Sequence, residues 1–246
     1  TGMFRNGLIP SGSKDPFALR RAGAGVVRIL TENEFLRGKL HLVSVVNASF
    51  TDGDWDDNFL RAKILDFMLD RLEFFLQESF AIKLQVARAA RNSVIAAKYD
   101  GRVDELVGYG HVTGFARALN EEAASSNVTA VAELLKRTSN ILRQAREKKM
   151  SFGNSVADAL LREPAEKELS RRVSEVDRAI QKNYRAGNYS EVIAAIASLQ
   201  QPLNAFFDSV MVMVDDPQLR GNRLGLLSRT ESVVRWAADF SELASI

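Results

Sequence analysis

The sequence predicts an all-α protein in which a helical N-terminal region is followed by a bundle of about five helices. Apolar residues recur at helical spacing along most of the chain. Asp15-Pro16 and Asp216-Pro217 each combine a capping carboxylate with a proline, which the first helical turn tolerates. Residues 40–46 are the one stretch rich in β-branched side chains, and this stretch is too short to be assigned as strand or helix.

The composition is that of a globular protein, because 46% of the 246 residues are hydrophobic and 26% are charged. No apolar run approaches the roughly 18 to 20 residues that span a bilayer, so we expect no membrane association. The absence of cysteine excludes disulfides and thiolate metal sites. The chain opens with Thr1 and has no signal-peptide pattern, so we expect it to be part of a longer protein.

The order of apolar and polar segments predicts two domains. In the first half, helices are expected over residues 17–30, 59–80 and 83–97, and from Val103 onward. The polar segment at 120–129 predicts a junction, and hence domains at 1–118 and 119–246. The second domain should contain helices over 131–145, 164–184, 190–199, 203–214 and 217–240. The helix over 203–214 is expected to lie in the core, with Phe206, Phe207 and Met211 buried.

Side chains suited to metal binding or catalysis are sparse. His41 and His111 are the only histidines and do not have metal-ligand spacing. A packed or surface position is the simpler interpretation of both, although His111 also fits a functional loop residue. The acidic cluster at 52–57 lacks the glycine and distal glutamate of a calcium loop, so we interpret it as a capping turn. We therefore expect no catalytic residue, no metal site and no cofactor in this chain.

Positive charge is concentrated in one helix. The net charge is only +2, so a nucleic-acid site would have to be a local patch. Residues 136–149 hold six basic side chains and one acid, Glu147. A helical wheel places the apolar residues of this helix on one face, and the opposite face contains Lys136, Arg137, Asn140, Arg143, Gln144 and Lys148. This face fits either a nucleic-acid contact or an ordinary solvated surface, and Asn140 fits either a base contact or a structural hydrogen bond.

Four motifs in a fixed order carry a resemblance to one family. They are SGSKDPFALRRA at 11–22, RTSNIL at 137–142, LREPAE at 161–166, and NAFFDSVMVM at 204–213 with LRGNRLGLL at 219–227. With these motifs the chain resembles the β subunits of bacterial tetrameric glycyl-tRNA synthetases, from Gly7 to near Ile246. It departs from the family at Ser11, where threonine is usual, and at Gly23, where alanine is frequent.

The resemblance implies a part of glycine–tRNA ligase, a cytoplasmic α2β2 enzyme that attaches glycine to tRNA(Gly) with ATP and Mg²⁺. In this family the α subunit performs the chemistry and the β subunit recognises tRNA, so the chain alone should be inactive. Residues 1–118 are similar to the end of a region related to HD phosphohydrolases, and residues 119–246 to a DALR-type anticodon-binding helical bundle. No His-Asp dipeptide occurs, so the metal chemistry of HD proteins is not transferred to any residue.

The resemblance also makes the polar face of the 131–145 helix a candidate tRNA site. Its lysines and arginines can neutralise phosphates, while Asn140 and Gln144 can contact base edges that a single-stranded loop exposes. Arg220 and Arg223, at the start of the last helix, are further candidates because free N–H groups there favour phosphate. Structural salt bridges are the alternative for these two arginines.

Other interpretations stay open at this point. Lys14, Arg20 and Arg21 fit either contact with the tRNA backbone or packing within the protein. The whole chain also fits a non-catalytic helical scaffold that binds protein partners. A degenerate HD-type hydrolase is a third function class, and the missing metal ligands disfavour it.

Overall fold

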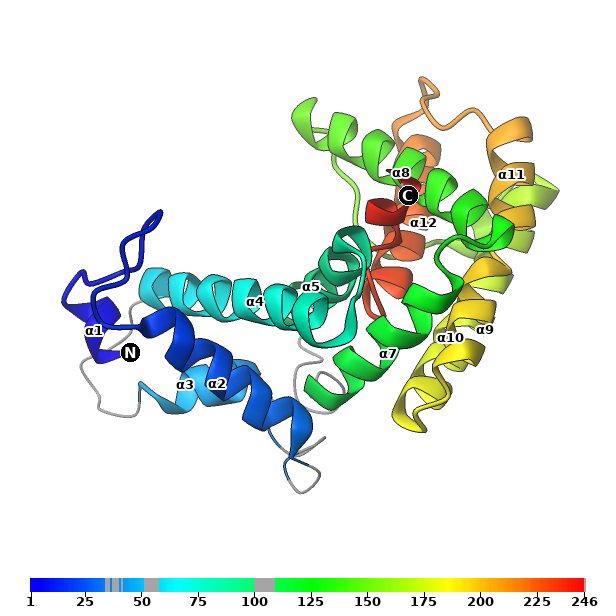
Figure 1. Ribbon diagram of the computed structural model, residues 1–246. Coiled ribbons are helices and arrows are strands. Elements are labelled where there is room, and N and C mark those ends of the chain that lie inside the picture. The colour runs from blue at the N-terminus through cyan, green and yellow to red at the C-terminus, as the bar shows by residue number, and fades with distance from the viewer. Residues whose placement is uncertain (34–35, 37–39, 41, 51–57, 100–108, 246) are drawn as a thin grey trace.

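The computed structural model confirms an all-α fold in the part of the chain that it describes (Figure 1). The described residues are 1–33, 36, 40, 42–50, 58–99 and 109–245. Among them the only β-type pairing is an isolated bridge between Ser11 and Lys14. Within the same ranges, the structure contains no helix with the length and apolar character needed to cross a membrane.

The N-terminal lobe is built around one long helix, α4 (Asn58–Phe80). α2 (Leu19–Glu32) and α3 (Leu42–Ala48) pack along α4, as does the short α1 (Gly2–Arg5). A Cβ at Gly23 of α2 would lie 2.9 Å from the Phe67 ring, so an alanine at this position would require the ring to shift. α5 (Leu84–Tyr99) packs on α4 and connects the lobe to the C-terminal bundle.

The C-terminal bundle is dominated by its two longest helices, α8 and α9, and closed by the 3₁₀ segment η2, which packs against both α8 and α5. Its elements are α7 (Tyr109–Glu122), α8 (Ser126–Glu147), η1 (Asp158–Leu160), α9 (Pro164–Arg185), α10 (Tyr189–Ala197), α11 (Gln200–Ser209), α12 (Pro217–Arg235) and η2 (Phe240–Ser245). In the described part of the chain, α8 to α12 are the five helices that the sequence predicts for this region.

The predicted junction at 120–129 contains a tight turn at 123–125, and its other residues belong to α7 and α8. α7 ends at Glu122, and the Ser125 hydroxyl caps α8 by accepting the N–H of Val128 at 3.4 Å. α7 and α5 both belong to the predicted first domain, yet they pack on α10 and η2 of the second. One continuous hydrophobic core crosses the predicted boundary. The division into domains at 118/119 therefore stays a prediction.

Local structure adds detail to the sequence prediction at three places. Asp15 caps α2 by accepting the N–H groups of Leu19 and Arg20 at 2.8 and 2.9 Å, but the helix begins only at Leu19 because Ala18 is left-handed (φ 52°). The stretch at 40–46, which the sequence leaves unassigned, overlaps α3. His111 lies within α7, which agrees with the helix predicted from Val103 onward and not with the alternative of a loop residue. His41 and the acidic cluster at 52–57 lie outside the described residues.

The largest difference lies between α11 and α12. The sequence predicts one helix over 203–214, but α11 ends at Ser209, and Val210 is extended with φ −114° and ψ 116°. From there side chains alternate, because Val210 and Val212 are buried whereas Met211 is 72% and Met213 is 39% exposed. The prediction of a buried Met211 was therefore wrong. Phe206 is fully buried as predicted, and Phe207 is half-buried.

One buried ion pair joins α9, α12 and the segment between α11 and α12. Glu166, in the first turn of α9, is fully buried, and its Oε1 accepts the Nε–H of Arg223 from α12 at 2.6 Å. Its Oε2 accepts the backbone N–H groups of Arg162 and Glu163 at 2.6 and 2.8 Å. Arg223 also donates from Nη1 to the carbonyl of Met211 at 2.8 Å. Buried charges are tolerated when they are paired and hydrogen-bonded in this way.

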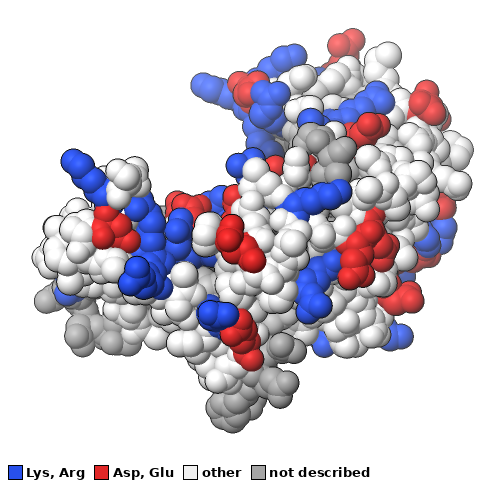
Figure 2. Space-filling view, in the orientation of Figure 1, with Lys and Arg blue, Asp and Glu red and all other residues white. Residues whose placement is uncertain are grey.

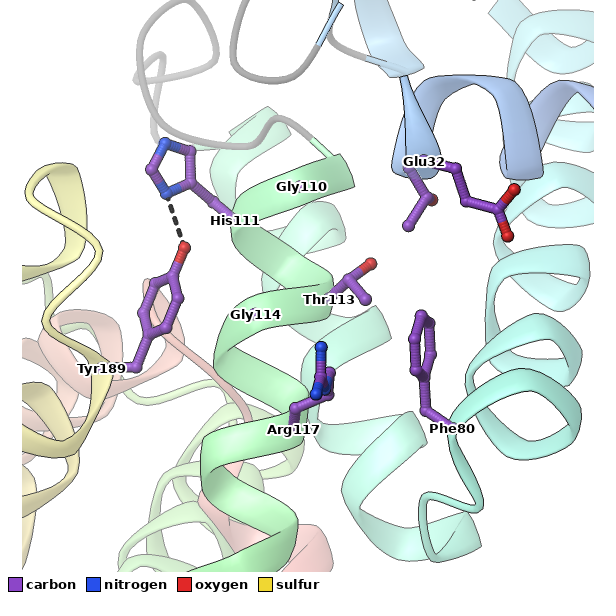
Figure 3. A pocket seen from close by; sticks show the side chains of 9 residues that line it. Glu32, Phe80, Gly110, His111, Thr113, Gly114, Arg117 and Tyr189 are labelled. Carbon is purple, nitrogen blue, oxygen red and sulfur yellow. Dashed lines mark hydrogen bonds between the residues drawn. The ribbon is translucent and has the colours of Figure 1, made fainter. Parts of the chain in front are cut away.

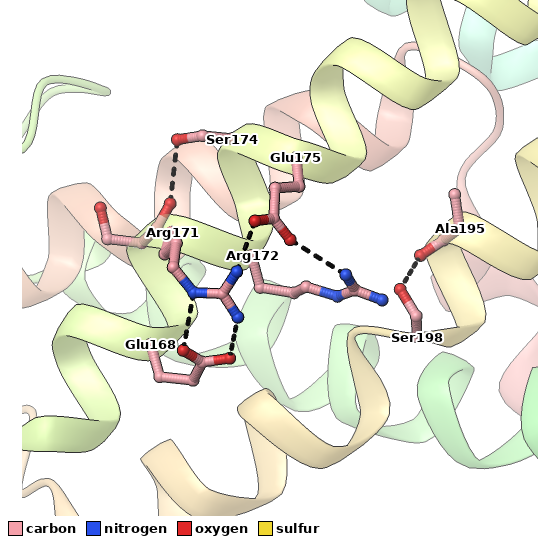
Figure 4. Close-up of polar contacts among 8 residues, drawn as sticks. Glu168, Arg171, Arg172, Ser174, Glu175, Ala195 and Ser198 are labelled. Atoms are coloured by element: carbon pink, nitrogen blue, oxygen red, sulfur yellow. Dashed lines mark hydrogen bonds and ion pairs between the residues drawn. The ribbon is translucent and has the colours of Figure 1, made fainter.

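We predict that Arg223→Leu lowers the free energy of unfolding by about 3–5 kcal/mol, because it leaves the Glu166 carboxylate buried without its partner. Chemical denaturation monitored by circular dichroism measures this loss. The matched control is Arg171→Leu on the outer face of α9, where Arg171 pairs with Glu168 and Glu175 in solvent (Figure 4). Exposed pairs contribute little, so similar losses in the two variants would contradict the structural role of Arg223.

Candidate nucleic-acid interface

α8 has the amphipathic character that the sequence predicts. Its buried side chains face the bundle core at Val128, Val131, Ala132, Leu135, Thr138, Leu142 and Ala145. The opposite face carries the six predicted site residues, and every one of them is exposed: Lys136, Arg137, Asn140, Arg143, Gln144 and Lys148. The structure therefore brings these six together on one face of one helix.

Glu231 of α12 fixes how α8 is rotated about its axis. Its Oε1 accepts the hydroxyl of Ser139 at 2.5 Å, and its Oε2 lies 3.6 Å from Nη2 of Arg146. Each residue of an α-helix is turned by roughly 100° from the one before. With Ser139 held toward α12, Asn140 is directed to solvent. No local sequence pattern indicates this role of Glu231, because it lies 92 positions from Ser139.

The polar side chains on this face differ in whether they already have a hydrogen-bond or salt-bridge partner within the protein. Within the described part of the chain, Lys136 and Lys148 have no carboxylate at salt-bridge distance, and the side-chain amides of Asn140 and Gln144 make no hydrogen bond. The structural hydrogen bond considered for Asn140 is therefore not formed. Arg143 pairs with Glu147 at 2.8 Å, with both side chains 60% exposed. Such a pair is weak in water and can exchange for a phosphate contact.

The surface around α8 is basic and faces a hollow. Figure 2 shows Lys and Arg side chains gathered over the end of α8 that projects at the upper left of the bundle, at the rim of a hollow toward the N-terminal lobe. Further basic side chains lie across the hollow on that lobe. A concave surface with basic rims attracts a polyanion more strongly than the net charge of +2 suggests.

The charges of α9 behave differently from those of α8. On its outer face Arg171 bridges Glu168 and Glu175, and Arg172 also pairs with Glu175 at 3.0 Å (Figure 4). The hydrogen bond from Arg171 lowers the pKa of Glu168, and that from Arg172 lowers the pKa of Glu175. These charges neutralise one another along the helix. The charges of α9 between positions 168 and 175 therefore pair with one another, while Lys136 and Lys148 have no carboxylate partner in the described chain.

Arg220 and Arg223, predicted at the start of the last helix, both contact protein atoms. Arg223 is 6% exposed and is held by Glu166 and by the Met211 carbonyl. This burial argues against a phosphate contact, so Arg223 does not belong to the candidate site. Arg220 is half-buried, and its Nη1 donates to the carbonyls of Val214 and Asp215 at 2.8 and 3.3 Å. A tRNA contact by Arg220 stays a prediction.

The basic residues of the first motif divide in the same way. Arg20 is half-buried and donates from Nη2 to the carbonyl of Gly12 at 2.8 Å, which is a packing role. Lys14 and Arg21 are exposed. Arg21 lines a shallow pocket of about 310 Å³ between α2 and α4. Arg20 therefore has a packing role, and a tRNA contact by Lys14 or Arg21 stays a prediction.

A second pocket, of about 390 Å³, lies where α2, α7 and α10 meet (Figure 3). His111 lies at its edge, with Nδ1 2.9 Å from the Tyr189 hydroxyl oxygen, and its ring stacks on Tyr184 at 5.6 Å. Burial raises the pKa of Tyr184. His111 is thus a packed residue of α7. Among the described residues no three His, Cys, Asp or Glu side chains are grouped so that they could hold a metal ion.

Sequence comparison identifies the class of the bundle first. The family described as DALR anticodon binding domain matches residues 131–240, which contain most of α8 and all of α9 to α12. Residues 131–240 are therefore similar to anticodon-binding domains of the DALR class, and most of the exposed face of α8 lies within this segment.

The second comparison extends this to the whole chain. The family described as glycyl-tRNA synthetase β subunit matches residues 1–92. The chain is 36% identical over 248 residues to the glycine–tRNA ligase β subunit of Acidobacterium capsulatum, and 35% identical over 243 residues to that of Vibrio cholerae. These alignments cover 99% and 98% of the chain and 33% of each relative. The chain belongs to the glycyl-tRNA synthetase β-subunit family and spans about a third of the length of these curated relatives.

We predict that replacing Lys136 and Lys148 together by alanine weakens tRNA binding without unfolding the protein, because both side chains are exposed. Each lost phosphate contact should reduce the log–log salt dependence of binding by about 0.7 to 0.9. Binding measured at several salt concentrations gives this slope. Lys182→Ala, an exposed lysine in the last turn of α9, is the control and should leave the slope unchanged. An unchanged slope in the double variant would mean that the face is only solvated.

Proposed function

We propose that this chain is the tRNA-recognising part of a glycine–tRNA ligase β subunit and that it binds the anticodon loop of tRNA(Gly) through the exposed face of α8. The observation that carries the proposal is the set of unpaired lysines and amides on that face, within the segment that matches the anticodon-binding family. The curated relatives are named glycine–tRNA ligase β subunits, which supports glycine tRNA as the substrate.

The face of α8 offers the two kinds of contact that a single-stranded loop requires. Lys136 and Lys148 are three helical turns apart and can neutralise phosphates along the loop. Asn140 and Gln144 lie between them, one helical turn from each other, and can pair with base edges that are unstacked in the loop. None of these groups is a nucleophile or a general base, so their role is recognition.

The chemistry of the enzyme is proposed to lie elsewhere. We infer a partner α subunit in an α2β2 assembly, which holds ATP and Mg²⁺ and forms the bond between glycine and tRNA. The location is proposed to be the cytoplasm, where tRNA is charged. A gel-shift comparison of tRNA(Gly) with an unrelated tRNA tests the proposal against the scaffold alternative. A scaffold for protein partners would bind neither tRNA with preference.

We predict that Asn140→Ala narrows the preference for tRNA(Gly) over other tRNAs by about 1–3 kcal/mol, the scale of a lost base-edge contact. Its salt dependence should match that of the parent, because an amide neutralises no phosphate. Competition binding with the two tRNAs at two salt concentrations measures both quantities. An equal loss of affinity for every tRNA would assign Asn140 to the backbone instead of a base.

We also predict that the chain alone forms no glycyl-adenylate, because its described residues contain no metal-binding group and its sequence contains no phosphate-binding loop. Glycine-dependent exchange of pyrophosphate into ATP is the assay. Exchange by the purified chain, in the absence of any other subunit, would overturn the assignment of the chemistry to a partner.

A further inference from the structure

The exposed methionines between α11 and α12 are the feature that the α8 site leaves unexplained. Single exposed apolar side chains are ordinary on protein surfaces. Here, however, Met211 is 72% and Met213 is 39% exposed, while Val210 and Val212 beside them are 6% and 8% exposed. The segment is thus extended, with its valines directed into the core and its methionines into solvent.

Two arginines hold this segment in place through its backbone. Arg223 donates to the carbonyl of Met211, and Arg220 donates to those of Val214 and Asp215. The Arg223 guanidinium is itself fixed by the buried Glu166. Side-chain contacts to main-chain carbonyls fix where the methionines stand without covering them. The exposed position of the Met211 side chain is therefore fixed by the hydrogen bond to its own backbone carbonyl.

The neighbouring helix α8 supplies a cation beside Phe207, in the last turn of α11, just before the methionine segment. The Arg137 guanidinium carbon lies 4.2 Å from the ring centroid of Phe207, which precedes Met211 by four residues. Arg137 is exposed and Phe207 is half-buried, so one face of the guanidinium covers the ring and the other faces solvent. A guanidinium plane and a polarisable thioether are both surfaces on which a flat ring packs well.

We propose that Arg137, Phe207, Met211 and Met213 form a stacking platform for an unstacked nucleobase of the bound RNA loop. The inference rests on the proposed function and extends the exposed face of α8, at Arg137, onto α11 and the methionine segment. Single-stranded RNA is recognised by bases that stack on aromatic, apolar or arginine surfaces while cations hold the phosphates. The platform adjoins α8 through Arg137, so the loop backbone follows the lysines of α8 and one base turns onto the methionines.

The acidic groups near the platform agree with a base and not a phosphate as its occupant. Asp208 and Asp215 are exposed beside the methionine segment, and Asp216 caps α12 by accepting the N–H of Gln218 at 2.9 Å. These carboxylates repel a phosphate. A neutral base is not repelled, and its exocyclic amino groups are donors for carboxylate oxygens.

The test compares Met211→Ala with Met3→Ala in the full-length protein, because Met3 is an exposed methionine of the N-terminal lobe (41%). Met211→Ala should weaken binding of tRNA(Gly) by about 5- to 100-fold, the range for loss of one stacked base. Its salt dependence should equal that of the parent, whereas Met211→Phe should retain binding. Thermal unfolding of each variant verifies that the fold is kept.

A second arm replaces the anticodon-loop nucleotides of tRNA(Gly) by abasic ones, one at a time. The loss caused by Met211→Ala should vanish for one abasic position and persist for the others, which identifies the stacked base. If the parent prefers tRNA(Gly) but Met211→Ala binds as Met3→Ala does, the platform is overturned and the proposed function stands. If Met211→Ala instead disrupts assembly with another protein, the methionines are a protein interface and the inference is also overturned. If the parent shows no preference for tRNA(Gly), the proposed function itself fails, and the platform with it.

Discussion

The buried pair between Glu166 and Arg223 is the interaction on which the C-terminal bundle depends. Glu166 accepts two backbone N–H groups at the start of α9 and the Nε–H of Arg223, and Arg223 donates onward to the Met211 carbonyl. The motifs at 161–166, 204–213 and 219–227 therefore meet at one place. Asn222, beside Arg223, accepts the N–H of Ala157 at 2.7 Å and donates to its carbonyl at 3.2 Å, which also fixes the loop before α9.

In this arrangement the buried arginine and the exposed lysines of the bundle have different roles, one structural and the other at the surface. Arg223 is buried (6% exposed), and it connects α12 with α9 and with the segment between α11 and α12. The lysines of α8 are exposed and hold no other element in place. The orientation of α8 depends instead on the hydrogen bond between Ser139 and Glu231. A recognition surface on a rigid helix loses little conformational entropy of the backbone when it binds. The motifs at 161–166 and 219–227 thus supply the buried residues that hold the bundle together. The motif at 137–142 supplies part of the exposed face of α8.

Whether the sequence predicts a structural feature depends on how far apart along the chain the interacting residues lie. The amphipathic pattern of α8 and the solvent-facing position of its six polar residues depend on local periodicity, and the structure confirms both. The burial of Arg223 depends on a carboxylate 57 positions away, which no local pattern indicates. At 210–214 two periods compete: helical spacing fits Leu203, Phe206 and Val210, while the alternation of valine and methionine fits an extended segment. The extended segment forms because Arg220 and Arg223 occupy its carbonyls.

The distribution of charge explains why the net charge of +2 understates how basic the exposed face of α8 is. Opposite charges nearly cancel overall, yet they cancel locally only where the helix repeat brings them together, as Arg171, Glu168 and Glu175 are on α9. α8 carries two acids, Glu133 and Glu147. Glu147 pairs with Arg143, and Lys136 and Lys148 have no carboxylate at salt-bridge distance in the described chain. Free cations on one helix, a concave surface and a fixed apolar platform beside it favour a flexible polyanion with exposed bases. A folded protein partner would require a broader apolar surface than two exposed methionines and a half-buried phenylalanine provide.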